Sequence, residues 1–238
     1  MLKKFHSNLF FRMVHRMRIA RKREHIFSDF ETIYDTADCS IHFKENCDSD
    51  LVILSFTGIG HSLGGIDIQQ PEFLSSLNIG SVYFIVDKKR SWGNNLDLTE
   101  ISRAILRRSS NKRIFCVGNS MGGFLAILIS SLVKAESVLA FAPQWSIDPE
   151  IVPFENRWMT YRSNITVLKY KDLSNSFAAS TRYLTYFGTI ALEKQHSIFF
   201  KHISNCETIE IDGADHNVAS FLKSRGQLSE VFDKWING

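Results

Sequence analysis

The residues of this chain best suited to covalent chemistry lie in a short motif around one serine. Gly118, Ser120 and Gly122 form a Gly-x-Ser-x-Gly pentapeptide. An apolar run at residues 114–117 precedes it, and an apolar-periodic stretch begins at Phe124. A serine at this place occupies a strand-to-helix turn too tight for bulky neighbours. The position of the motif between a strand and a helix therefore predicts a nucleophile at Ser120.

Such a serine must be positioned by a sheet, and the rest of the chain alternates regularly between short apolar runs and helical segments. Two runs at residues 26–34 and 39–43 are typical of an opening antiparallel hairpin. Further strands are expected at residues 51–56, 82–86, 113–117, 138–142, 165–169 and 208–211, and helices at 71–77, 98–107, 121–133, 177–187, 192–202, 218–223 and 228–236. Apolar strands separated by helices predict a parallel sheet covered on both faces, with ligands bound beyond the carboxyl ends of the strands.

Over residues 39–236 the chain resembles the α/β-hydrolase superfamily, in which the Gly-x-Ser-x-Gly turn is the nucleophile elbow. The resemblance implies an α/β fold with a mostly parallel central sheet, helices on both faces and a small lid or none. It also implies a serine hydrolase that acts on a small ester or thioester through an acyl-enzyme on Ser120, without a cofactor. Transfer of the acyl group to another hydroxyl would use the same residues.

The same resemblance implies a histidine and an acid that follow the nucleophile in the chain. His216 comes directly after the last expected strand and before a helix, where the family places its general base. Asp172, in the loop after the strand expected at 165–169, is the preferred acid, and Asp148 is the alternative. The neighbourhood of Asp172 lacks the Gly and Pro that many such hydrolases show around their acid.

Two backbone N–H groups are implied as donors to the oxyanion of the substrate. One is that of Met121, directly after the nucleophile. The other lies in the glycine-rich loop after the strand at 51–56, where Ile59 is preferred and Gly60 comes next. Gly58, Gly60 and His61 of this loop are expected to contact the substrate.

The loop at residues 87–94 carries three cations and Trp92, which suggests a rim for an anionic or sugar-like substrate group, although exposed basic loops are common.

Two other interpretations compete with a hydrolase. Gly58-x-Gly60, followed by a helix and a strand that ends at Asp87, resembles a dinucleotide-binding unit, but the third glycine falls at Gly64, one residue late. The loose acid motif favours a second alternative, a non-catalytic relative that binds a membrane or a partner.

Charge divides the chain into a basic segment at residues 1–26 and one expected hydrolase domain at residues 27–238. The first segment carries a net charge of +7 and the rest −4. Apolar residues recur at helical spacing in the segment, which predicts a basic amphipathic helix. Docking of this helix on its own domain is the preferred interpretation, and contact with an anionic membrane surface is the alternative.

Composition places the chain among ordinary globular proteins and predicts a cytoplasmic location, with peripheral membrane contact through residues 1–26 as a further option. The four cysteines have neither metal-like nor redox spacing, and neither a secretory signal nor an apolar run of transmembrane length is found in the sequence. No metal-binding motif and no nucleic-acid-reading module is recognised. The expected partner is a small acyl substrate.

Overall fold

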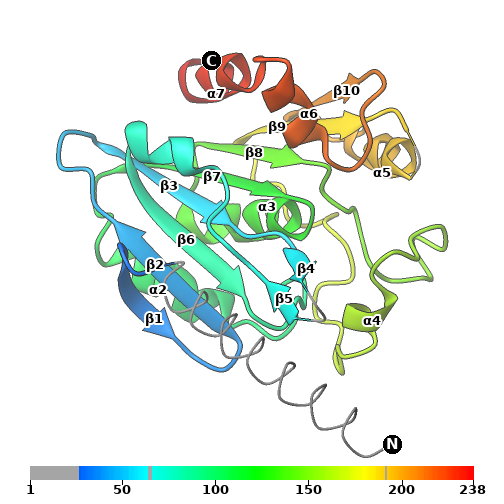
Figure 1. Cartoon of the computed structure of the whole chain (residues 1–238), viewed down its shortest axis with the longest axis horizontal. Helices are drawn as coiled ribbons and strands as arrows, with labels where there is room; N and C mark the ends of the chain where they lie inside the picture. Colours follow the sequence, from blue (N-terminus) through cyan, green and yellow to red (C-terminus); the bar gives the residue numbers. More distant parts are fainter. Residues whose placement is uncertain (1–26, 64–65, 191) are drawn as a thin grey trace, which may run out of the picture.

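The computed structural model describes residues 27–63, 66–190 and 192–238, and its centre is one twisted sheet of eight strands (Figure 1). The strand order is β1-β2-β6-β3-β7-β8-β9-β10. The strands are β1 (Glu31–Asp35), β2 (Cys39–Lys44), β3 (Leu51–Phe56), β6 (Ser81–Asp87), β7 (Arg113–Asn119), β8 (Ser137–Phe141), β9 (Arg182–Gly188) and β10 (Cys206–Ile211). A separate hairpin pairs β4 (His61–Leu63) with β5 (Ile66–Ile68).

The sheet is parallel from β6 to β10, and only the opening hairpin is antiparallel. β1 pairs antiparallel with β2, and β2 with β6, whereas all pairs from β6 and β3 through β10 are parallel. The carboxyl ends of six parallel strands therefore meet along one edge, which is where the sequence predicted the site.

Alternate side chains of each strand enter two different cores, one on each face of the sheet. In β7, Ile114 and Cys116 pack into one core, and Phe115 and Val117 pack into the other. This period of two is what an extended chain imposes. A strand buried on both faces must be apolar throughout, and this explains the continuous apolar runs in the sequence.

Helices cover both faces. The first core contains buried residues of α2 (Leu98–Leu106), α3 (Met121–Val133) and α5 (Glu193–Phe200). The second contains residues of α6 (Val218–Ser224) and α7 (Leu228–Asn237), with the short 3-10 helix η1 (Leu74–Asn78) packed against it. Figure 1 shows α6 and α7 near β8 and β9, at the end of the sheet away from β1 and β2. The predicted two-sided covering of the sheet is confirmed.

The seventh strand of the expected series lies elsewhere than predicted. Residues 165–169 are not a strand but part of a long connection between β8 and β9, which contains one short helix, α4 (Met159–Arg162). Val167 in that stretch is 62% exposed, so its apolar pattern does not report a core strand. The strand is β9 (Arg182–Gly188), most of which falls in residues 177–187, where a helix was expected.

The basic amphipathic helix expected at residues 1–26 lies outside the described residues. Within the ranges that are described, none of the helices has the length and apolar character needed to cross a membrane.

Candidate active site

Ser120 lies in a sharp turn between β7 and α3. Its backbone angles are φ 55° and ψ −122°, a left-handed conformation that non-glycine residues rarely adopt. A Cβ on Gly118 would lie 2.2 Å from the backbone of Gly122, and a Cβ on Gly122 would lie 2.3 Å from the carbonyl oxygen of Phe56. Both glycines are therefore required for the turn, which confirms the strand-to-helix geometry inferred from the motif.

A pocket of about 1060 Å³ opens at Ser120. It runs from the loop after β3 and the end of β7 toward η1, α6 and α7. Its lining residues include Gly58, Ile59, Gly60, Ser120, Trp158 and His216. The structure thus brings five of the residues singled out in the sequence to one cavity.

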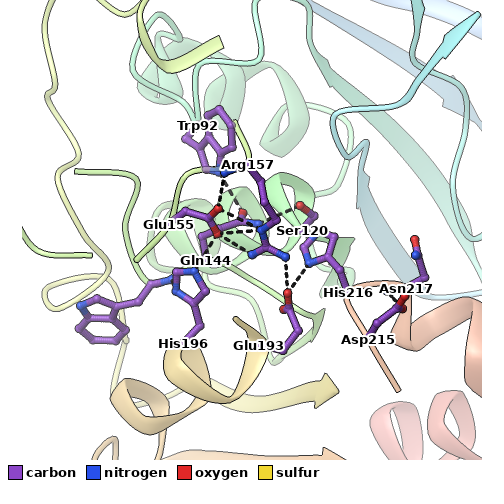
Figure 2. A network of polar contacts seen from close by, with 11 residues as sticks. Trp92, Ser120, Gln144, Glu155, Arg157, Glu193, His196, Asp215, His216 and Asn217 are labelled. Atoms are coloured by element: carbon purple, nitrogen blue, oxygen red, sulfur yellow. Dashed lines mark hydrogen bonds and ion pairs between the residues drawn. The ribbon is translucent and has the colours of Figure 1, made fainter. Parts of the chain in front are cut away.

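His216, in the loop between β10 and α6, is held by a buried glutamate. Its Nδ1 lies 3.0 Å from Oε1 of Glu193, whose side chain is 1% exposed. A carboxylate only accepts hydrogen bonds, so Nδ1 carries the proton and Nε2 is left with a lone pair. Within the described part of the chain, Nε2 has no hydrogen-bond partner. His216 therefore presents a proton acceptor in the pocket that Ser120 also lines (Figure 2).

The carboxylate on His216 is not one of the two that the sequence suggested. Oδ1 of Asp172 accepts from the N–H of Ser174, and Oδ1 of Asp148 accepts from the N–H of Glu150. The prediction that Asp172 holds His216 was wrong because it relied on a strand at 165–169. The carboxylate that holds His216 follows the true strand β9, and Glu193 is the first residue of α5.

Glu193 belongs to a charged network that Arg157 joins (Figure 2). Arg157 forms ion pairs with both Glu193 and Glu155, and Glu155 also contacts Nε2 of His196 at 3.0 Å. Burial tends to raise the pKa of Glu193, but the hydrogen bond from His216 and the charge of Arg157 hold it below its usual value. Burial also opposes ionisation of Glu155, yet His196 and Arg157 lower its pKa to about 2. Both glutamates are therefore ionised at neutral pH.

The loop expected to supply an oxyanion donor also lines the pocket. The N–H of Gly58 is occupied by Oε1 of Glu72 at 2.8 Å, whereas Ile59 is the next residue along the pocket wall. The N–H of Met121 belongs to the first turn of α3, where N–H groups have no partner within the helix. Burial raises the pKa of Glu72 to about 7, and the Gly58 N–H opposes this only in part.

Trp92 is not a rim residue, contrary to the sequence prediction. It is fully buried, and its indole N–H donates to Oε1 of Gln144. Two of the three cations of the same loop are also engaged, because Lys88 pairs with Asp35 and Arg90 is buried and donates to the carbonyl of Ile59. His61 begins β4, and its contact with substrate stays a prediction.

Gln144 was missed in the sequence. Its Nε2 donates to Oγ of Ser120 at 3.0 Å. Its position in the sequence could have indicated it. Gln144 comes shortly after the strand expected at 138–142, and this strand follows, in the expected series, the strand that carries the nucleophile. Gln144 completes a pattern. Each of the six parallel strands is followed at its carboxyl end by a residue that belongs to this site or that takes part in the hydrogen bonds holding it in place.

In the part of the chain that the structure describes, no group of three or more His, Cys, Asp or Glu side chains could hold a metal ion.

No family model and no curated protein sequence matches the chain. Solved structures do resemble it. The capsule O-acetyltransferase of Neisseria meningitidis serogroup A is 14% identical, with a TM-score of 0.59 over 85% of this chain and 93% of that one. XC6422 from Xanthomonas campestris, described as an α/β serine hydrolase without lid, is 10% identical, with a TM-score of 0.53 over 88% and 95% of the two chains. Est1E from Butyrivibrio proteoclasticus is 14% identical, with a TM-score of 0.54 over 86% and 98%.

These likenesses, together with the strand order and the turn at Ser120, define the class of protein: the chain has the α/β-hydrolase fold.

Proposed function

We propose that the protein is a serine-dependent acyl-transfer enzyme with Ser120 as nucleophile, His216 as general base and Glu193 as the orienting acid. One observation carries this proposal: Ser120 and His216 line the same pocket, Nε2 of His216 has no hydrogen-bond partner among the described residues, and buried Glu193 holds the opposite nitrogen of the ring. Nucleophile, base and orienting carboxylate in this relation define the triad logic of acyl transfer.

In the first half-reaction, Oγ of Ser120 forms a bond to the acyl carbon and passes its proton to Nε2 of His216. The carbonyl electron pair moves onto its oxygen, which the N–H groups of Ile59 and Met121 stabilise. When that pair returns, the bond to the leaving alcohol or thiol breaks, and the leaving group takes the proton from Nε2. The acyl group then stays on Ser120 as an ester.

In the second half-reaction, an incoming hydroxyl gives its proton to Nε2, and its oxygen attacks the acyl carbon. The bond to Oγ breaks, and Oγ recovers the proton from His216. Throughout both steps ionised Glu193 stabilises the imidazolium that forms. Water as acceptor gives hydrolysis, and an alcohol gives transfer.

The proposed substrates are small esters or thioesters, for which a pocket of about 1060 Å³ is ample. Transfer to a hydroxyl is a second candidate function, and the similarity to a capsule O-acetyltransferase over 85% of this chain favours it. The two functions share their first half-reaction and differ only in the acceptor.

Incubation of the purified protein with an aryl acetate and with an acetyl thioester tests the proposal, with product release and intact protein mass as readouts. We expect turnover or an acetylated protein in the wild type, and neither in Ser120→Ala. Ser220→Ala is the matched control, because Ser220 is an exposed serine on the wall of the same pocket. Equal acylation of the wild type and Ser120→Ala would refute the proposal.

Addition of glycerol or a monosaccharide to the same assay separates the two acceptors. Transfer predicts an acetylated polyol at the expense of free acetate. Hydrolysis predicts free acetate alone at every acceptor concentration.

A further inference from the structure

Three side chains that follow the strands β6, β7 and β8 form a hydrogen-bonded line that ends on Ser120. The indole Nε1 of Trp92, after β6, donates to Oε1 of Gln144 at 3.0 Å. Nε2 of Gln144, after β8, donates to Oγ of Ser120 at 3.0 Å. Figure 2 shows Gln144 between the tryptophan and the serine. Both Trp92 and Gln144 are 0% exposed, so water does not compete for these bonds.

The chemistry of the indole decides which way the amide of Gln144 points. An indole N–H donates and never accepts, so the oxygen of the amide must face Trp92. The NH₂ group therefore faces Ser120, and Oγ of Ser120 accepts. The hydroxyl proton of Ser120 then needs an acceptor other than Gln144. His216 lines the same pocket, and its Nε2 has no hydrogen-bond partner among the described residues.

The fold maintains Trp92 in an unfavourable backbone conformation at this place. Its φ is 50°, in the left-handed region that a bulky residue rarely adopts. The loop is braced by buried Asp87, whose Oδ2 accepts from the N–H groups of Ser91 and Gly93 and from the hydroxyl of Ser91. Asp87, which resembled a ribose-binding acid in the sequence, thus serves to hold the loop that carries Trp92.

We propose that Gln144 is a catalytic residue that donates to Oγ of Ser120 and directs the serine proton to His216, and that Trp92 is a positioning residue that fixes the orientation of the amide. This inference rests on the proposed function of Ser120. The bond from Nε2 stabilises negative charge on Oγ when it loses its proton in acylation. It does so again when Oγ becomes the leaving group in deacylation.

The rate of Ser120 labelling by a fluorophosphonate tests this inference in three variants. Gln144→Met keeps the length of the side chain without a donor, and we expect labelling to slow by about 10- to 100-fold, as for loss of a hydrogen bond to a charged group. Trp92→Phe keeps an aromatic ring but frees the amide to rotate, and the expected slowing is smaller, about 3- to 10-fold. Trp235→Phe is the matched control, because that indole is equally buried and its N–H has no partner among the described residues.

Gln144→Glu supplies a readout that a merely structural role would not change. The carboxylate would accept the Ser120 proton and draw it away from His216, so labelling is strongly reduced at neutral pH. It should recover relative to the wild type as the pH falls and the introduced carboxyl is protonated, because the acid can then donate.

Labelling of folded Gln144→Met and Gln144→Glu at the wild-type rate, with no change in pH profile, would overturn the inference and leave the proposed function intact. Absence of labelling in the wild type would instead refute the proposed function itself. Thermal unfolding of each variant shows whether it is folded, and the pH profile of isosteric Gln144→Glu decides the matter if Gln144→Met does not fold.

Discussion

Two histidine–glutamate pairs among the described residues have the same 3.0 Å separation, and of these two only the pair of His216 faces the pocket. Nδ1 of His216 lies 3.0 Å from Glu193, and Nε2 of His196 lies 3.0 Å from Glu155. Arg157 bridges the two glutamates (Figure 2). Residue types, distances and the shared cation do not distinguish the pairs.

The second nitrogen of each ring distinguishes them. Nδ1 of His196 accepts from the N–H of Trp145 at 3.1 Å, so both of its nitrogens are engaged and the proton lies on Nε2. His216 has the opposite tautomer, and its Nε2 is unpartnered among the described residues. A histidine–carboxylate pair is therefore structural when the second nitrogen is satisfied, and suited to proton transfer when that nitrogen is left free beside a nucleophile.

Replacement of each histidine by asparagine should give the largest difference between the two pairs. We expect His216→Asn to reduce the proposed acyl-transfer activity by about 10²- to 10⁴-fold, because it removes the proposed general base. His196→Asn should retain activity within about tenfold and lose about 1–3 kcal/mol of stability, because it disturbs buried hydrogen bonds. Activity assays and urea unfolding of both variants provide the comparison. Equal loss of activity in the two would mean that the free nitrogen does not matter.

Substitution of Glu193 and of Asp172 should likewise have different effects on activity. Glu193→Gln removes the charge that, in the proposed mechanism, stabilises the imidazolium, and it should slow turnover by about 100-fold or more. Asp172→Asn, the matched control, should stay within about threefold of the wild type, because its carboxylate bonds only its own loop. Steady-state kinetics at one pH compares the two. The reverse order would restore Asp172 as the acid.

Glu155 should matter for folding and not for chemistry. Its pKa of about 2 lies below the ordinary value of 4.5, so the ionised form stabilises the folded state above pH 4.5, and this stability is lost as the pH falls toward 2. Glu155→Gln should cost about 3 kcal/mol at neutral pH, and the cost should shrink below pH 4.5. Denaturant unfolding at pH 7 and pH 4 measures both values. A cost that grows in acid would contradict this explanation.

Glu72 shows the opposite behaviour to Glu155. It accepts a backbone N–H, but burial raises its pKa above the ordinary value. With a folded pKa of about 7 against 4.5, the folded state binds more protons, so stability falls as the pH rises from 4.5 to 7. Glu72→Gln should therefore stabilise the protein on the order of 1 kcal/mol at pH 8 and have no such effect at pH 4.5. Thermal unfolding at the two values checks this. Equal effects at both would show that Glu72 titrates normally.

The fold and half of the site could be predicted from the sequence because they depend on local patterns. The turn at Ser120 needs two glycines between a strand and a helix, and His216 follows the last strand directly. The run at 165–169 has the apolar character of a strand but lies partly at the surface. The real strand β9 is rich in aromatic residues and resembled a helix. Because of that single error, Asp172 was expected to hold His216, whereas Glu193 does so in the structure.

The remaining contacts depend on distances between segments far apart in the chain. Glu193, Arg157 and Glu155 come from a long connection and the start of a helix, and Gln144 is an ordinary amide until Trp92 fixes its orientation. Neither their spacing nor their type marks them in the sequence. Only packing brings them to Ser120 and His216.

Mass-spectrometric mapping of a fluorophosphonate adduct tests the central claim most directly, namely that Ser120 is a nucleophile activated by His216 and Glu193. The predicted result is one adduct on Ser120 in the wild type and in His196→Asn, a much slower adduct in His216→Asn, and none in Ser120→Ala. An adduct on another residue, or labelling of Ser120 at the same rate in His216→Asn as in the wild type, would contradict it.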